Sequence, residues 1–441
     1  MPTTPRSVCP RWHRRSWTAW LILTGAFSSD AAISRGFGQA PATGETFFDR
    51  PALTGNWGGA RDQLANHGVT FDLSLTQFYQ GAALGGALDG FQYGGKLDFY
   101  LNWDAEQALE WHGLSLGTHV ETRYGEDVNN TDGLLTFGNF NMAFPQPGET
   151  STGITSLKLM QQVGNNFTLI AGKINTLDDF VLDFTGMNGR DRFMNSAVVA
   201  NIINARTIPY STYGAGFSAS FDRGPLFTFL ARDPDDHATT ADLDQLFAHG
   251  VVLTGSLRVP VSPLGLSGTQ VFGGNWSSRR FSSVDPSSWV NVPGQGTPSP
   301  TEHGSWAAYW NFDQHLWIDP SNAGRRVGIF GMTGISDGNP NPIRWNATVG
   351  VGAGGLVPGR KNDTCGAGYF YVATSDHFKD FVAQPPEPPG LEQRNEQGVE
   401  LYYNVAITPW CNLTFDAQVA EPSTRGLDTT VLLGARLKVA F

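Results

Sequence analysis

Apolar and polar residues alternate with a period of two through most of this chain, from about residue 69 to the last residue. In the final segment, for example, Leu437, Val439 and Phe441 alternate with Arg436 and Lys438. Successive side chains of a β-strand point to opposite faces, so this pattern predicts strands with one apolar and one polar face. The apolar face requires either a second sheet, as in a soluble sandwich, or lipid, as in an outer-membrane barrel.

The number of alternating segments favours the barrel. We count sixteen, and an even number is typical of a barrel whose two ends lie on the same side of the membrane. The predicted strands lie near residues 69–76, 97–103, 114–124, 154–162, 167–175, 212–222, 226–232, 250–260, 268–277, 304–316, 327–336, 343–353, 367–375, 398–408, 412–420 and 428–441.

The predicted connections alternate between short and long. Residues 164–166 and 222–225 are short links, whereas residues 125–153 and 176–211 are long ones. Short turns at one end and long loops at the other are typical of outer-membrane barrels. The sequence therefore predicts an all-β fold, a sixteen-stranded antiparallel transmembrane β-barrel. Both long loops carry several phenylalanines, which favours packing inside the barrel over exposure, and either loop is a candidate to narrow the pore.

Residues 1–32 are expected to be a cleaved signal peptide. A basic stretch that ends at Arg15 precedes an apolar core, 17–27, that is too short to span a bilayer. Small residues follow, and they allow cleavage after Ala32 or as late as residue 40. The mature protein is therefore expected outside the cytoplasm.

Residues 33–67 precede the first strand and are expected to form a periplasmic segment with one short helix, which Gly68 closes. The barrel is expected to occupy residues 68–441. Trp57, Arg61 and Asp62 of the predicted helix are candidates to plug or seal the periplasmic mouth of the barrel.

Charge and motifs argue against several classes of function. A formal net charge of -11 argues against nucleic acid as a partner, because binding phosphates needs a basic surface. The sequence contains no spacing typical of metal ligands, phosphate-binding loops or nucleophile elbows. We therefore expect no enzyme, cofactor or metal. A barrel hydrolase that assembles its catalytic residues across strands is the alternative.

Two cysteines, Cys365 and Cys411, remain after the predicted signal peptide. Both are expected at strand ends beside the short turns, in an oxidising compartment. A disulfide between them is one prediction, and two unpaired thiols are the other.

The start and the end of the barrel region carry further motifs. Residues 53–61 read Leu-Thr-Gly-Asn-Trp-Gly-Gly-Ala-Arg, and residues 68–71 read Gly-Val-Thr-Phe. With the closing segments 400–410 and 434–441, they resemble the carbohydrate-selective porin family of Gram-negative outer membranes. The resemblance implies a porin, surrounded by outer-membrane lipid, that passes sugars such as monosaccharides into the periplasm by passive, partly selective diffusion. A general, non-selective porin is the alternative, and both a homotrimer and a monomer are left open.

Charged and amide side chains at inward positions are candidates to line the pore, because such groups bind sugar hydroxyls. Lys96 and Asp98 share one face of a predicted strand, and Glu121 and Arg123 share one face of the next, so these four charges are expected to cluster. The alternative is that they are ordinary solvated residues of the wall. The candidate pore-lining or substrate-binding residues are Lys96, Asp98, Asn102, His119, Glu121, Arg123, Asp178, Asp179 and Arg206.

Overall fold

The computed structural model describes residues 46–441, apart from 88–89, 147–149, 179–180, 222–223, 290–299 and 384–391. The predicted signal peptide, its two cleavage sites and Asp179 lie outside the described residues. In the described part of the chain, no helix is long and apolar enough to cross a membrane.

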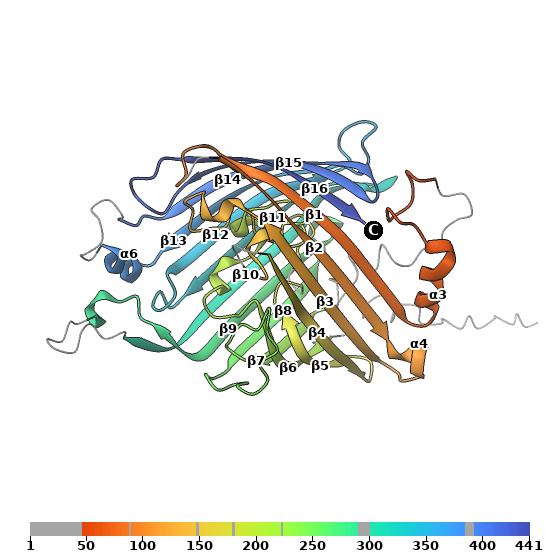
Figure 1. Ribbon diagram of the computed structural model, residues 1–441, viewed down its shortest axis with the longest axis horizontal. Coiled ribbons are helices and arrows are strands. Elements are labelled where there is room, and N and C mark those ends of the chain that lie inside the picture. The colour runs from red at the N-terminus through yellow and green to blue at the C-terminus, as the bar shows by residue number, and fades with distance from the viewer. Residues whose placement is uncertain are drawn as a thin grey trace, which may run out of the picture.

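Sixteen antiparallel strands form one closed barrel, as predicted (Figure 1). Each strand pairs with its neighbours in the sequence, and β1 and β16 close the cylinder through pairs such as Ser74 with Ala440. The strands are β1 Val69–Leu84, β2 Gly90–Asp104, β3 Leu114–Gly125, β4 Ser151–Val163, β5 Phe167–Asn175, β6 Ser211–Ser220, β7 Leu226–Arg232, β8 Val252–Val261, β9 Gly268–Ser282, β10 Thr301–Asp319, β11 Asn322–Ser336, β12 Ile343–Gly354, β13 Thr364–Thr374, β14 Glu396–Thr408, β15 Cys411–Glu421 and β16 Thr430–Ala440.

Short helical elements lie in the connections and before β1. They are η1 Trp57–Gly59, α3 Ala60–Asn66, α4 Ala105–Leu109, η2 Val128–Asn130, η3 Asn141–Ala143, α5 Ser196–Val199, η4 Ile202–Asn204, η5 Pro263–Gly265, η6 Pro286–Ser288 and α6 Asp376–Val382. The helix predicted just before the first strand is therefore confirmed, with its first turn as the 3₁₀-helix η1.

The segment that contains α3 lies beside the barrel at its short-turn end (Figure 1). The Arg61 guanidinium lies 4.6 Å from the ring centroid of Phe71, and the Trp57 ring lies 5.1 Å from the same ring. Side chains alternate between the two faces of β1, and Ser74 is fully buried inside the barrel. Phe71, three residues earlier, therefore faces outward. Trp57 and Arg61 therefore cover the rim from outside. The prediction that they seal the mouth is wrong, because the outward ring of Phe71 draws them to the apolar face.

Two long loops fold into the barrel from the opposite end. Loop 2 is residues 126–150, between β3 and β4, and loop 3 is residues 176–210, between β5 and β6. The expectation that their phenylalanines pack inside the barrel is confirmed for Phe140, Phe184 and Phe193. Phe137 is 41% exposed, and Phe180 lies outside the described residues. The loops and strands β10–β14 share a buried apolar cluster that includes Phe140, Phe184, Phe193, Val198, Ile203, Phe330, Phe370 and Tyr402.

Glycines in the wall make room for this cluster. A Cβ atom on Gly328 of β11 would lie 2.2 Å from the Phe184 ring, and one on Gly352 of β12 would lie 2.7 Å from it. A Cβ atom on Gly366 of β13 would likewise lie 2.7 Å from the Phe193 ring. Because any larger residue would overlap the rings, these inward glycines allow loop 3 to lie directly on the strands.

The outward face of the barrel is apolar. Leu159, Val349, Leu401 and Phe415 alternate with inward residues, and each is between 45% and 54% exposed. Such a face is suited to the hydrocarbon of a membrane.

Cys365 and Cys411 are free thiols, so the predicted disulfide is not formed. Cys365 lies on β13 and Cys411 on β15, and β14 lies between them. Two strand spacings separate the residues by at least roughly 9–10 Å, whereas the Cα atoms of a disulfide lie no more than about 7 Å apart. The alternative of two unpaired thiols is the one observed.

Candidate pore

An open cavity of about 650 Å³ lies between loop 3 and the wall formed by strands β4–β10. Its lining extends from Asp236, in the long loop after β7, to Leu226, which follows the short turn before β7. The residues that line the cavity therefore lie at both the loop end and the short-turn end of the barrel, as a passage for solutes requires.

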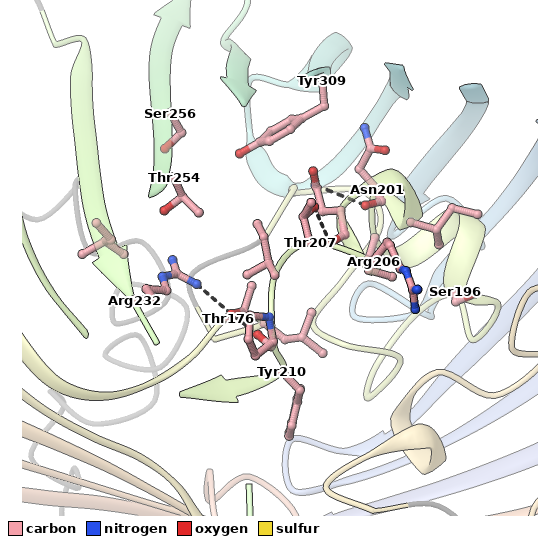
Figure 2. A pocket seen from close by; sticks show the side chains of 18 of the residues that line it. Thr176, Ser196, Asn201, Arg206, Thr207, Tyr210, Arg232, Thr254, Ser256 and Tyr309 are labelled. Carbon is pink, nitrogen blue, oxygen red and sulfur yellow. Dashed lines mark hydrogen bonds between the residues drawn. The ribbon is translucent and has the colours of Figure 1, made fainter. Parts of the chain in front are cut away.

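Hydroxyl, amide and aromatic groups line much of this cavity. Tyr309 of β10 and Phe144 of loop 2 offer ring surfaces, and Arg232 donates a hydrogen bond of 2.7 Å to the Thr176 hydroxyl of loop 3. Such a lining can replace water around a polar solute. Figure 2 shows the wall residues Arg232, Thr254, Ser256 and Tyr309 together with the loop 3 residues Thr176, Asn201, Arg206, Thr207 and Tyr210.

The opposite half of the lumen, beside strands β1–β3, holds a buried cluster of charges. Lys96 forms an ion pair with Glu121, and His119 Nε2 lies 3.2 Å from an Asp98 oxygen. None of these four residues is more than 4% exposed. The predicted clustering of charges on the second and third strands is thus present, with His119 at its centre.

Loop 3 completes this cluster. Asp178 lies 3.0 Å from His119 Nδ1, and Arg190 Nε lies 3.4 Å from Asp98. A carboxylate faces each ring nitrogen of His119, so both nitrogens donate only when the ring is protonated. The cluster then holds three cations and three anions, and this balance offsets the desolvation of the buried charges.

Arg190 is the cation that loop 3 contributes. It donates hydrogen bonds to the Ser74 hydroxyl at 2.6 Å and to the Tyr100 hydroxyl at 3.0 Å. Burial alone would lower the pKa of Arg190, but the neighbouring Asp98, Tyr100 and Asp72 raise it. The guanidinium therefore stays charged, and it fixes loop 3 to the wall.

Asp98, His119 and Glu121 also present three possible metal ligands within 4.8 Å of one another. A metal does not fit this donor set, because Lys96 and Arg190 already supply the positive charge that the carboxylates require. The adjoining cavity measures about 10 Å³, which is hardly the space of one water molecule.

The remaining candidates are spread over both halves. Arg123 is fully buried and forms an ion pair with Asp127 of loop 2. Asn102 is half-buried on β2, and its side-chain oxygen lies beside Gly117 of β3. Of the predicted site residues that the structure describes, only Arg206 lines the 650 Å³ cavity. The others hold the inward loops or lie on the opposite wall.

Comparison with known proteins assigns the chain to a family. Residues 89–441 match the model of the family described as "Carbohydrate-selective porin, OprB family". The chain belongs to this family. No curated protein sequence matches the chain.

Solved porin structures share the fold of this family member at low sequence identity. OprB of Pseudomonas putida at high pH has a TM-score of 0.77 at 17% identity, covering 90% of this chain and 100% of that chain. Its low-pH structure has a TM-score of 0.56 at 14% identity, covering 89% and 99%. The outer membrane channel DcaP of Acinetobacter baumannii has a TM-score of 0.51 at 11% identity, covering 85% and 97%.

A second contact fixes loop 3 of this porin close to the open cavity. Asp183 lies 3.1 Å from His315 of β10 and 2.9 Å from Arg326 of β11. Burial alone would raise the pKa of Asp183, but the hydrogen bond from His315 and the charges of Arg192 and Arg326 lower it to about 2. The carboxylate is therefore ionised at neutral pH.

Loop 2 is held by two buried carboxyl groups. Glu396 of β14 accepts backbone hydrogen bonds from Leu135 at 2.6 Å and Thr136 at 2.9 Å. Asp132 accepts them from Leu134 and Gly138. Burial raises the pKa of Asp132 to about 8; the backbone hydrogen bonds oppose this shift, and the nearby Glu396 adds to it. Loop 2 thus has a carboxyl group that changes charge near neutral pH.

The predicted set omitted several residues that hold the loops. Arg436 of β16 donates hydrogen bonds to the backbone oxygens of Gly189 and Arg192, at 2.7 and 2.8 Å. Glu400 of β14 accepts the backbone N–H of Asn195 at 3.0 Å. Alternation along the strands identifies Arg436 and Glu400 as inward residues. Their partners are loop backbone atoms, which no sequence pattern marks.

Proposed function

We propose that this chain is an outer-membrane porin through which sugars, such as monosaccharides, diffuse passively and with partial selectivity into the periplasm. The 650 Å³ cavity with its hydroxyl, amide and aromatic lining is the observation that carries this proposal. Membership of the carbohydrate-selective porin family supports it. The apolar outer face supports a location in lipid, and both a trimer and a monomer are compatible with it.

The lining offers a physical basis for partial selectivity. Hydroxyl groups such as those of Thr254 and Ser256 can exchange hydrogen bonds with sugar hydroxyls, while the ring of Tyr309 can cover a sugar's C–H face. Each contact is weak, so a sugar is retained only briefly and still leaves. Loop 3 is anchored to the wall on both sides of the lumen, which favours a channel of constant width.

Liposome swelling provides the test. We expect proteoliposomes to admit glucose faster than a neutral amino acid of equal size. Tyr309→Ala should reduce this preference, whereas Tyr79→Ala should leave it unchanged, because Tyr79 is 56% exposed on the outer face. Rates that depend on size alone would identify a general, non-selective porin instead. Sugar-dependent block of single-channel currents would measure the same binding directly.

A further inference from the structure

A row of hydroxyl groups crosses the wall of the open cavity at one level. Ser218 of β6 pairs in register with Thr228 of β7, and Thr228 pairs with Ser256 of β8. The hydroxyls of Ser218 and Thr228 lie 2.9 Å apart, and all three residues line the cavity. At the same level, the Tyr309 ring of β10 lies over Gly273 of β9, where an added Cβ atom would come within 2.3 Å of it. Figure 2 shows Tyr309 extending toward Ser256, so this hydroxyl row ends at an aromatic ring.

Apolar side chains of the two inward loops form another part of the same cavity. They are Leu135 and Phe144 of loop 2 and Leu177 and Ile202 of loop 3, and together we call them the apolar loop face. All four are half-buried, and they pack against the buried apolar cluster that the loops share with strands β10–β14. One side of each is thus covered by protein, while the other borders the passage.

The wall carries apolar residues next to the hydroxyl row. Ile170 of β5 and Leu230 of β7 line the cavity one inward position nearer the loop end, at the level of Gly216. Both are largely buried and leave only an edge toward the cavity. Two residues separate the two levels, about 7 Å along the strands. This spacing is comparable to the separation of the two rings in an aryl glycoside.

The combination is unusual for a pore that conducts only small polar solutes. The lumen of an outer-membrane porin is generally polar. A single apolar residue at a surface needs no ligand, but here four from two loops border one passage that also contains an ordered row of hydroxyls. The cavity is therefore amphipathic, and an amphipathic solute matches both of its surfaces.

We propose that the passage favours sugars that carry an apolar substituent, in the form of aryl glucosides, over free monosaccharides. This inference rests on the proposed function, because it names a substrate class for the same passage. The sugar ring exchanges hydrogen bonds with the hydroxyl row, and the aryl group lies on the apolar loop face. Removing apolar surface from water strengthens binding relative to free glucose, while the weak individual contacts still allow release.

Block of single-channel currents by phenyl β-glucoside and by glucose tests the proposal. We expect phenyl β-glucoside to block at about tenfold lower concentration, the effect of partly burying one aromatic ring. In proteoliposomes, phenyl β-glucoside should enter faster than cellobiose, a solute of similar size that is polar throughout. Liposomes without protein correct for passage of the aryl glucoside through lipid.

Variants separate the two parts of the site. Leu177→Asn, which nearly keeps the size of the side chain, should raise the blocking concentration of phenyl β-glucoside but not that of glucose. Leu243→Asn is the matched control, because Leu243 is 61% exposed in the loop after β7 and is not among the described residues that line the cavity. Ile208→Thr changes another apolar residue of loop 3 that lines the cavity but lies outside the buried cluster. Thr228→Val should weaken block by both solutes, because it removes one hydroxyl of the row.

The outcomes separate the two proposals. Equal blocking concentrations for phenyl β-glucoside and glucose would overturn the aryl-glucoside inference and leave the sugar porin in place. Block by phenyl β-glucoside that Leu177→Asn and Ile208→Thr both leave unchanged would do the same. If neither solute blocked the current and both entered no faster than amino acids of similar size, the sugar porin itself would be refuted.

Discussion

The two halves of the lumen use inward-facing charges in opposite ways. Beside β1–β3, Lys96, His119 and Arg190 are matched by carboxylates and covered by loops 2 and 3. Beside β4–β10, charged side chains such as those of Arg206 and Asp236 border an open cavity. Inward position is therefore a poor guide to contact with solute. The loops decide which charges become internal supports and which remain in the channel.

The largest effect is expected when Arg190, which fixes loop 3 to the wall, is removed. Arg190→Ala leaves Asp98 buried without its loop partner, and breaking a buried ion pair costs roughly 3–5 kcal/mol. We expect loop 3 to detach, so that single-channel conductance rises and proteolysis cuts loop 3. Arg425→Ala, which removes an exposed arginine, serves as the control. Unchanged conductance in Arg190→Ala would show that the charge cluster does not hold the loop.

A second test attacks the apolar support of loop 3 on the other side of the lumen, at β11 and β12. Gly352→Val places side-chain atoms where the Phe184 ring lies, and overpacking of this kind costs about 1–3 kcal/mol. We expect a lower midpoint of thermal unfolding and noisier channel currents. Gly359→Val is a suitable spatial control, because a Cβ atom there has no neighbour within 4 Å, although its positive φ adds some backbone strain. Equal effects of the two variants would contradict the close packing of Phe184.

The hold on loop 2 should depend on pH. The pKa of Asp132 is raised to about 8, from an unfolded value of about 4, so the folded state favours the protonated acid. Its stabilising contribution is complete below about pH 4 and is lost as pH rises through about 8. Proteolysis of loop 2 should therefore increase as the pH rises from about 4 to about 8 and then level off. Asp132→Asn should flatten this profile, and an unchanged profile would assign the pH dependence to another group.

The smallest expected effect concerns the two cysteines of the barrel wall. Cys365→Ser and Cys411→Ser should each change the free energy of unfolding by no more than about 0.5 kcal/mol, because neither thiol forms a covalent bond. Alkylation of the denatured protein without reductant should modify both cysteines. If neither cysteine were alkylated, the measured mass would instead support a disulfide between them.

The sequence predicts the strands of the barrel well, but it does not predict what the inward charged residues contact. The strands follow from alternation, because a wall with lipid on one face and polar groups on the other forces a period of two. The roles of Lys96 and Asp98 did not follow, because their burial depends on where loop 3 lies. Gly328 and Gly352 were the available signal: inward glycines on neighbouring strands mark a wall against which something packs.

The two ends of the chain meet at the junction of β1 and β16. Leu53 donates a backbone hydrogen bond to Ala440 at 2.8 Å, and the Arg61 side chain reaches Phe441 at 2.5 Å. These contacts exist only once the final strand is in place. The segment before β1 therefore bridges the junction of the first and last strands, and removing Ala440 and Phe441 would remove both of these hydrogen bonds.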